Sequence, residues 1–214
     1  MEKMPKPPEL EEADAPAPAE VDDWRQALPL LTGRLVSLRE VRPTDAPHLV
    51  TLLTAPEVSR FLSTPPTTIA EFQRFVDWAI KEREAGAYAC YVVVPHEAQH
   101  PVGLLHLRQL EPRFATAEWG FALGSDYWGS GFFMDSARLM IDFAFGIAGT
   151  HRLEARAALQ NGRCNNALQK IGAIKEAVLR RAFFRAGEYL DQALWTIVED
   201  DWFRAKTAWS IRVH

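Results

Sequence analysis

The 214-residue chain contains only two cysteines, Cys90 and Cys164, too few for a disulfide framework. No stretch approaches the roughly 18–20 apolar residues that a membrane-spanning helix needs. The first residues lack an apolar central stretch, so they do not resemble a secretory signal peptide. No spacing of histidine, cysteine and acidic residues is typical of a metal site. Together these absences predict a cytoplasmic protein without a metal or a membrane segment.

Acidic residues are concentrated at the start of the chain. Residues 1–23 contain eight aspartates and glutamates, two lysines and several prolines. Such a composition buries too little apolar surface to fold, so residues 1–27 are predicted to be a disordered, acidic, proline-rich tail. The tail could contact a basic partner or simply aid solubility. The net charge of the whole chain is −4, so the remainder is close to neutral and predicts no direct contact with nucleic acid.

Hydrophobic periodicity predicts strands mixed with helices. A capping box at residues 68–71 opens one of the helices, which ends near Gly86. Antiparallel meanders are combined with a strand–loop–helix–strand unit, which favours an α+β fold with helices on a mixed sheet. The strands are expected over residues 36–40, 88–94, 101–110, 114–123, 153–159, 174–184 and 189–198. The helices are expected over residues 45–53, 68–86, 134–147 and 164–171.

The most informative segment is Tyr-Trp-Gly-Ser-Gly-Phe-Phe at residues 127–133. It joins a predicted strand to a predicted helix. Two glycines at such a junction let consecutive backbone N–H groups point into one concavity, where the positive end of the helix dipole also acts. This arrangement suits a diphosphate. An ordinary tight turn would carry the same glycines, so the segment alone leaves both interpretations open.

Further segments surround the glycine pair in a fixed order. They are Arg-Leu-Val-Ser-Leu-Arg at 34–39, Ala-Glu-Trp-Gly-Phe at 117–121, Asn-Gly-Arg-Cys at 161–164, Gln-Lys-Ile-Gly-Ala at 169–173, Leu-Arg-Arg at 179–181 and Gly-Glu-Tyr-Leu-Asp at 187–191. In this order, from about Leu31 to Trp202, the chain resembles the GNAT acyltransferases, in particular the RimJ/RimL branch that acetylates ribosomal-protein N-termini. The resemblance implies a GNAT domain over residues 28–203, with a mostly antiparallel sheet of six to seven strands, and a C-terminal extension over 204–214.

The resemblance also implies acetyl-CoA as co-substrate, with no metal. The pantetheine arm would lie along a strand edge and contact Asn161, and the diphosphate would bind at the glycine pair. The residues implied are Phe121, Ala122 and Leu123 for the arm and Trp128, Gly129, Ser130, Gly131 and Phe132 for the diphosphate. A backbone N–H near Ala122 or Leu123 would stabilise the oxyanion while an amine attacks the thioester directly in a ternary complex.

Two protons move in such a transfer. Glu118 is predicted to be the general base for the amine, directly or through a water; the alternative is a solvated or ion-paired strand carboxylate. Cys164 stands where the RimJ/RimL branch has a serine and is predicted to protonate the leaving thiolate; the alternative is a small residue packed at a helix start. Asn161 could also cap that helix. Strand alternation lets His106 face the substrate cleft or water.

The chain departs from the family pattern at several positions. Met134 replaces a threonine, Asp126 stands where Gln or Arg is common, and Leu168 stands where many members have a tyrosine acid. The prediction is an N-acetyltransferase that acetylates the primary amine of a protein N-terminus or of a small molecule. The alternative is a catalytically weak CoA-binding sensor or scaffold. A homodimer is left open.

Overall fold

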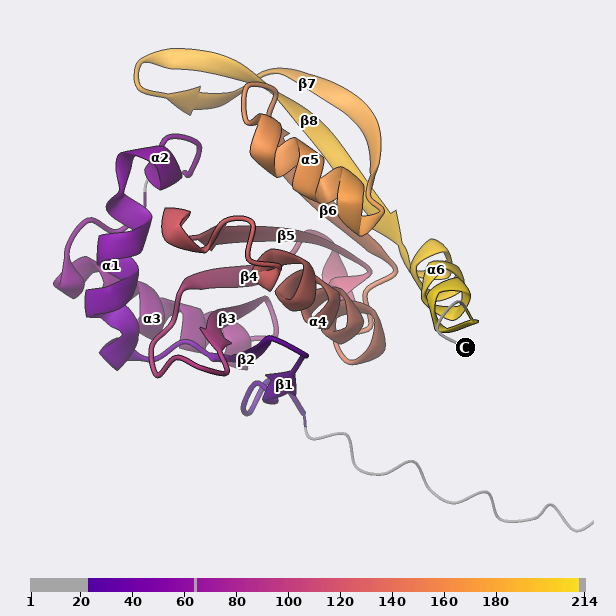
Figure 1. Ribbon diagram of the computed structural model, residues 1–214, viewed down its shortest axis with the longest axis horizontal. Coiled ribbons are helices and arrows are strands. Elements are labelled where there is room, and N and C mark those ends of the chain that lie inside the picture. Colours follow the sequence, from indigo (N-terminus) through magenta and orange to yellow (C-terminus); the bar gives the residue numbers. More distant parts are fainter. Residues whose placement is uncertain (1–22, 64, 212–214) are drawn as a thin grey trace, which may run out of the picture.

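The computed structural model of the protein describes residues 23–63 and 65–211. One eight-stranded sheet, in the order β1-β2-β3-β4-β5-β6-β8-β7, carries helices on both faces (Figure 1). The strands are β1 (Leu31–Thr32), β2 (Val36–Glu40), β3 (Tyr88–Pro95), β4 (Gly103–Gln109), β5 (Thr116–Leu123), β6 (Arg152–Ala158), β7 (Ile174–Arg185) and β8 (Glu188–Val198). The α-helices are α1 (Ala46–Thr54), α2 (Pro56–Ser59), α3 (Ile69–Glu84), α4 (Phe132–Gly146), α5 (Gly162–Ile171) and α6 (Glu199–Ile211). Short 3-10 turns are η1 (Pro43–Asp45), η2 (Pro112–Phe114) and η3 (Ser125–Tyr127).

The predicted α+β fold with a mixed, mostly antiparallel sheet is confirmed. Every neighbouring pair of strands is antiparallel except β5 and β6. The seven strands expected from periodicity are present, and the eighth is β1, whose two residues are too few to produce a pattern. The final hairpin turns where expected, since Arg185 pairs with Glu188. Among the described residues, no helix is long and apolar enough to cross a membrane.

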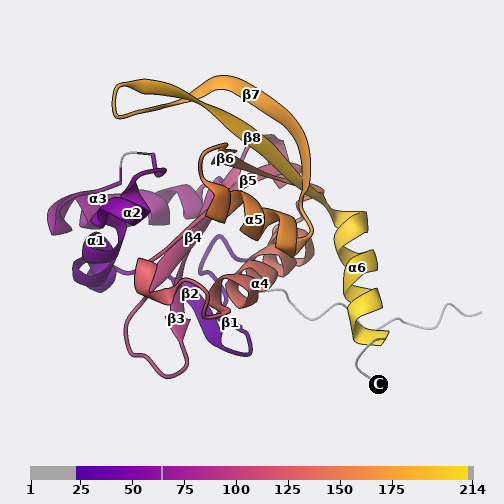
Figure 2. The same ribbon diagram turned by 45° about the horizontal axis from the view of Figure 1, so that its top comes forward.

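Two apolar cores lie on opposite faces of the sheet. Helices α1, α2 and α3 gather on one side and α4 and α5 on the other (Figures 1 and 2). Strand β3 is buried on both faces, because Ala89 and Tyr91 pack towards α4 whereas Cys90 and Val92 pack towards α1 and α3. Helix α3 begins with the predicted capping box, in which the Thr68 hydroxyl accepts the backbone N–H of Glu71 at 3.2 Å.

The folded domain begins before the predicted boundary at residue 28. Trp24 is only 5% exposed and packs edge-on against Phe114 and Phe143, with ring centroids 5.4 and 6.0 Å apart. Residues 23–27 are therefore part of the domain, and the prediction for residues 1–22 lies outside the described residues. At the other end, α6 crosses the predicted boundary between residues 203 and 204. The Trp202 indole N–H in this helix donates to Asp142 of α4 at 2.8 Å.

The feature that positions the site is the divergence of β5 from β6. The two strands pair in parallel over only three residues, Thr116–Glu118 with Arg152–Glu154. Beyond these residues, β5 stays paired with β4 as far as Leu123 and β6 stays paired with β8 as far as Ala158. The facing edges of β5 and β6 are therefore open. Open strand edges carry unpaired backbone groups, which a ligand can satisfy by lying along them.

Candidate functional site

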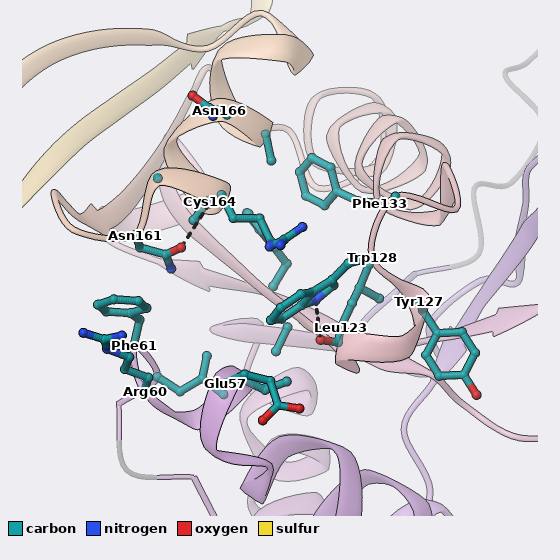
Figure 3. Close-up of a pocket in the computed structure, with 18 of the residues that line it drawn as sticks. Glu57, Arg60, Phe61, Leu123, Tyr127, Trp128, Phe133, Asn161, Cys164 and Asn166 are labelled. Carbon is teal, nitrogen blue, oxygen red and sulfur yellow. Dashed lines mark hydrogen bonds between the residues drawn. The ribbon is translucent and has the colours of Figure 1, made fainter.

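A cavity of about 840 Å³ opens where β5 and β6 diverge (Figure 3). Four segments surround it: the end of β5, the loop between η3 and α4 with the first turn of α4, one side of α5 with the two residues before it, and α2 with the residues after it. The volume lies within the range of small-molecule and cofactor sites. Segments far apart in the sequence thus converge on the open strand edges.

The loop at residues 128–131, which we call the glycine loop, presents free backbone donors. Gly129 and Gly131 have φ of 82° and 88°, values that favour glycine over any residue with a side chain. Within the described chain, the N–H groups of Gly129, Ser130 and Gly131 donate to no acceptor. The loop leads directly into α4, whose dipole adds positive potential. The loop therefore has the geometry of an anion site at a helix N-terminus.

Not every predicted contact residue of the glycine loop faces the cavity. Trp128, Gly129 and Gly131 line it, whereas Ser130 and Phe132 do not. The Ser130 hydroxyl instead donates to the carbonyl of Tyr127 at 2.7 Å and accepts the N–H of Phe132 at 3.3 Å. The Ser130 side chain therefore stabilises the loop conformation. Only its backbone N–H is available to an anion.

Trp128 connects the glycine loop to its surroundings. Its indole N–H donates to the carbonyl of Leu123 at 3.0 Å, which fixes the ring beside the end of β5 (Figure 3). The Arg163 guanidinium of α5 lies 4.2 Å from the centre of this ring, a cation–π contact. Phe121, Ala122 and Leu123, the predicted arm-binding residues, line the cavity next to it.

Three cations that line the cavity were not predicted from the sequence: Arg60, which follows α2, and Arg163 and Lys170 of α5. Arg163 and Lys170 both project from α5 towards it. They are seven residues apart, which is two helical turns, so they share one face of the helix. That spacing, together with the place of Arg163 inside the Asn-Gly-Arg-Cys segment, was the available signal. Both charges suit the phosphate groups of an anionic ligand.

Asn161 has the capping role that the sequence offered as its alternative. Its side-chain oxygen accepts the N–H of Cys164 at 3.1 Å and so caps α5. Its amide nitrogen has no hydrogen-bond partner in the part of the chain that the structure describes, and the residue lines the cavity. Capping and a contact to a bound ligand are therefore compatible.

Cys164 also lines the cavity, but its surroundings keep it protonated. Burial raises the pKa of its thiol to about 12. The leaving thiolate of a thioester such as acetyl-CoA has a pKa of about 8.5, so a proton transfer from Cys164 would be uphill by about three orders of magnitude. The environment therefore disfavours both a general acid and a thiolate nucleophile at this position.

Replacing Cys164 with alanine should accordingly lower kcat by less than about threefold, far below the roughly 100-fold or greater effect of losing a general acid. Steady-state rates of the two proteins check this expectation. At pH 8, Cys164 should also react with iodoacetamide roughly 1000-fold more slowly than a free thiol, because so little of it is thiolate. A 100-fold loss of kcat in C164A would restore the general-acid role.

Glu118 lies at the point of divergence but outside the cavity wall. Its carboxylate is hydrogen-bonded to the Arg108 guanidinium and lies 3.9 Å from that of Arg156, and its side chain is 17% exposed. Strand alternation places it on the same face of β5 as Ala122, four residues before it. The ion-paired alternative is therefore present in the structure. The base role stays a prediction that requires a water between Glu118 and the amine.

His106 lies beside Glu118 on the same face of the sheet. Its Cα is paired with Gly120, and its ring stacks on Tyr88 at 5.5 Å. Burial lowers the pKa of His106 to about 4, so the imidazole is neutral at pH 7. In the described residues, no group of three or more histidines, cysteines and acidic residues is placed to hold a metal ion.

Comparison with known proteins connects this geometry to one family. Residues 35–174 match the family described as acetyltransferase (GNAT) domain. Uncharacterized N-acetyltransferase p20 of Bacillus licheniformis is 24% identical over 174 residues, which are 81% of this chain and 97% of the relative. Spermidine N(1)-acetyltransferase of Vibrio cholerae is 24% identical over 99 residues, 46% of this chain and 57% of the relative. The solved structure of RimL, the ribosomal L7/L12 alpha-N-protein acetyltransferase in complex with coenzyme A, has a TM-score of 0.73 at 20% identity, covering 81% of this chain and 99% of that one.

Proposed function

This chain belongs to the GNAT acetyltransferase family, and we propose that it transfers the acetyl group of acetyl-CoA to a primary amine of a protein N-terminus or of a small molecule. Two neighbouring features support the proposal. The edges of β5 and β6 are open where the strands diverge, and the glycine loop has free N–H groups. The first feature can hold an extended arm and the second a diphosphate.

Different residues of the cavity would bind different parts of acetyl-CoA. The N–H groups of Gly129, Ser130 and Gly131 would hold the diphosphate, and Arg163 and Lys170 would balance its negative charge. The pantetheine arm would lie along Phe121–Leu123, with the free amide of Asn161 as a further donor. A backbone N–H at Ala122 or Leu123 would then stabilise the oxyanion.

Acetyl transfer then needs no covalent enzyme intermediate. The amine nitrogen attacks the thioester carbon, the carbonyl oxygen becomes an oxyanion, and collapse breaks the carbon–sulfur bond and releases the thiolate of CoA. Because this thiolate has a pKa of about 8.5, it can leave without a strong acid beside it. The amine loses one proton, which Glu118 would accept through a water. The protein contributes mainly proximity and orientation.

Names of relatives suggest two acceptor classes. The RimL structure is that of an alpha-N-protein acetyltransferase, and the Vibrio cholerae relative is a spermidine acetyltransferase. The glycine loop and the arm-binding strand serve either class, so the acceptor has to be found by assay. A cytoplasmic location, the absence of nucleic-acid contacts and a homodimer stay predictions.

The proposal is tested by following thiol release from acetyl-CoA with three acceptors: an alanyl tetrapeptide with neutral side chains, spermidine and phenethylamine. We expect steady release with at least one of them, together with acetylation of the amine detected by mass spectrometry. Tight binding of CoA without turnover on any acceptor would instead favour the sensor or scaffold. That alternative draws support from Leu168, which is fully buried where many family members have a tyrosine acid.

A further inference from the structure

Glu57 of α2 differs in charge from the other ionised side chains of the cavity. Within the described chain, it is the only carboxylate among the lining residues, which include the cations Arg60, Arg163 and Lys170. Arg163 and Lys170 project from α5, whereas Glu57 projects from α2. In Figure 3, the carboxylate of Glu57 lies on the α2 side of the cavity, and Cys164 and Asn166 lie on the α5 side. The α5 side of the cavity therefore carries two positive charges, whereas the α2 side carries one negative and one positive charge.

A hydrogen bond orients this solvent-exposed carboxylate. The Ser125 hydroxyl, in the turn after β5, donates to one oxygen of Glu57 at 2.7 Å. Val58, the next residue, is 7% exposed and anchors α2 in the core. From the other side, Arg185 of the β7–β8 hairpin donates to the carbonyl of Ser59 at 3.0 Å, and this hairpin reaches over α2 in Figure 2. The Ser125 bond holds the carboxylate and the Arg185 bond holds the end of α2, which reduces the side-chain entropy lost when a ligand binds.

The chemistry of Glu57 suits a cationic ligand more than proton abstraction. The hydrogen bond from Ser125 lowers the pKa of Glu57, and a hydrogen bond from its own backbone N–H acts in the same direction. The group therefore stays ionised at neutral pH and is a weak base. In the described part of the chain no cation is paired with this carboxylate, so its charge remains available to a cationic ligand.

We infer that Glu57 binds the ammonium form of the acceptor and positions its nitrogen beside the end of β5, where the ammonium loses one proton to solvent before the neutral nitrogen attacks the thioester. This inference rests on the proposed function, because it assigns the amine subsite of the same cavity. Once CoA phosphates neutralise Arg163 and Lys170, the α2 side retains one carboxylate and one cation, Arg60. One negative and one positive side chain suit an acceptor that carries a single ammonium group and is otherwise neutral. A polyamine would place a further ammonium near Arg60, so the site selects monoamines.

The test measures KM for the amine and for acetyl-CoA in the wild type, E57Q and S125A, with the same three acceptors. E57Q keeps the shape and the oxygen that accepts from Ser125 but removes the charge. We expect it to raise KM for the alanyl tetrapeptide about tenfold, the range of a charge-assisted hydrogen bond, and to leave KM for acetyl-CoA unchanged. The difference in KM between E57Q and the wild type should shrink above about pH 9, where the α-amine of the tetrapeptide is neutral.

S125A separates the charge of Glu57 from its structural contact. This variant loses the bond that orients Glu57 but keeps the carboxylate, so KM for the amine should rise by no more than about threefold, clearly less than in E57Q. The inference is wrong if E57Q leaves that KM unchanged, if S125A raises it equally, or if spermidine is preferred to the tetrapeptide. A wild type that releases no thiol with any acceptor would overturn the proposed function itself, and the inference with it.

Discussion

Replacing Gly129 with aspartate is expected to weaken coenzyme A binding by about 100-fold, because a like charge beside the diphosphate costs several kcal/mol. A side chain at this position meets no atom of the described chain within 4 Å, so it would project into open space at the cavity wall. Aspartate also tolerates the positive φ of 82° better than most residues. The domain should therefore stay folded, and calorimetric titration with CoA measures the loss.

The matched control is Gly129→Asn, which has the same shape and the same tolerance of positive φ but no charge. Its CoA affinity should fall by less than about tenfold, since only a modest steric effect remains. Equal losses in G129D and G129N would mean that backbone geometry alone matters at this position. Unchanged affinity in G129D would place the diphosphate elsewhere.

Glu118→Gln should lower kcat about 100-fold while leaving CoA affinity unchanged, the lower end of the range for losing a general base. The carboxylate lies where β5 and β6 separate, outside the lining of the CoA cavity. Its loss should therefore affect proton transfer and leave cofactor binding intact. Single-turnover rates measured with a saturating amine check this expectation.

Arg108→Gln provides the control for the ion pair. Arg108 is the residue hydrogen-bonded to Glu118, and its side chain is 50% exposed, so its replacement should disturb the fold little. R108Q removes the pairing but keeps the carboxylate, and kcat should fall by less than about threefold. If E118Q and R108Q lose activity equally, or if E118Q keeps full activity, Glu118 has a structural role only.

The sequence was sufficient to predict the local unit of strand, glycine loop and helix. The period of the apolar residues changes after Leu123, and glycines occupy the two positions of positive φ, so local signals agree with the final structure. The capping box at Thr68 and the cap at Asn161 are equally local. Features decided within a few residues of chain could therefore be recognised.

Features that depend on contacts between distant segments could not be predicted from the sequence. Helix α2 has four residues, too few for a periodic pattern, so Glu57 carried no signal. Trp24 belongs to an acidic, proline-rich stretch whose average composition hides one buried aromatic ring. Alternation could place Glu118 on a face of β5, but the place where β6 diverges depends on pairing with a strand about thirty residues later.

Two departures from the family pattern, Asp126 and Met134, lie next to the glycine loop in the sequence. Asp126 does not line the cavity, so its carboxylate makes no direct contact with a diphosphate there. Asp135, in the first turn of α4, accepts the N–H groups of Leu35 and Val36 at 2.6 and 3.1 Å and so ties the helix to β2. Met134 does line the cavity without a hydroxyl. Phosphate contacts at this loop would therefore come from backbone N–H groups and not from a hydroxyl at position 134.

Amide chemical shifts test the central role of the glycine loop most directly. ¹⁵N-labelled protein would be titrated with CoA and, separately, with pantetheine, which has the arm but no diphosphate. We expect CoA to shift the N–H resonances of Gly129, Ser130 and Gly131, whereas pantetheine at saturation leaves them nearly in place and shifts Phe121–Leu123. Loop resonances that stay unmoved at saturating CoA, or that move equally with pantetheine, would contradict the account.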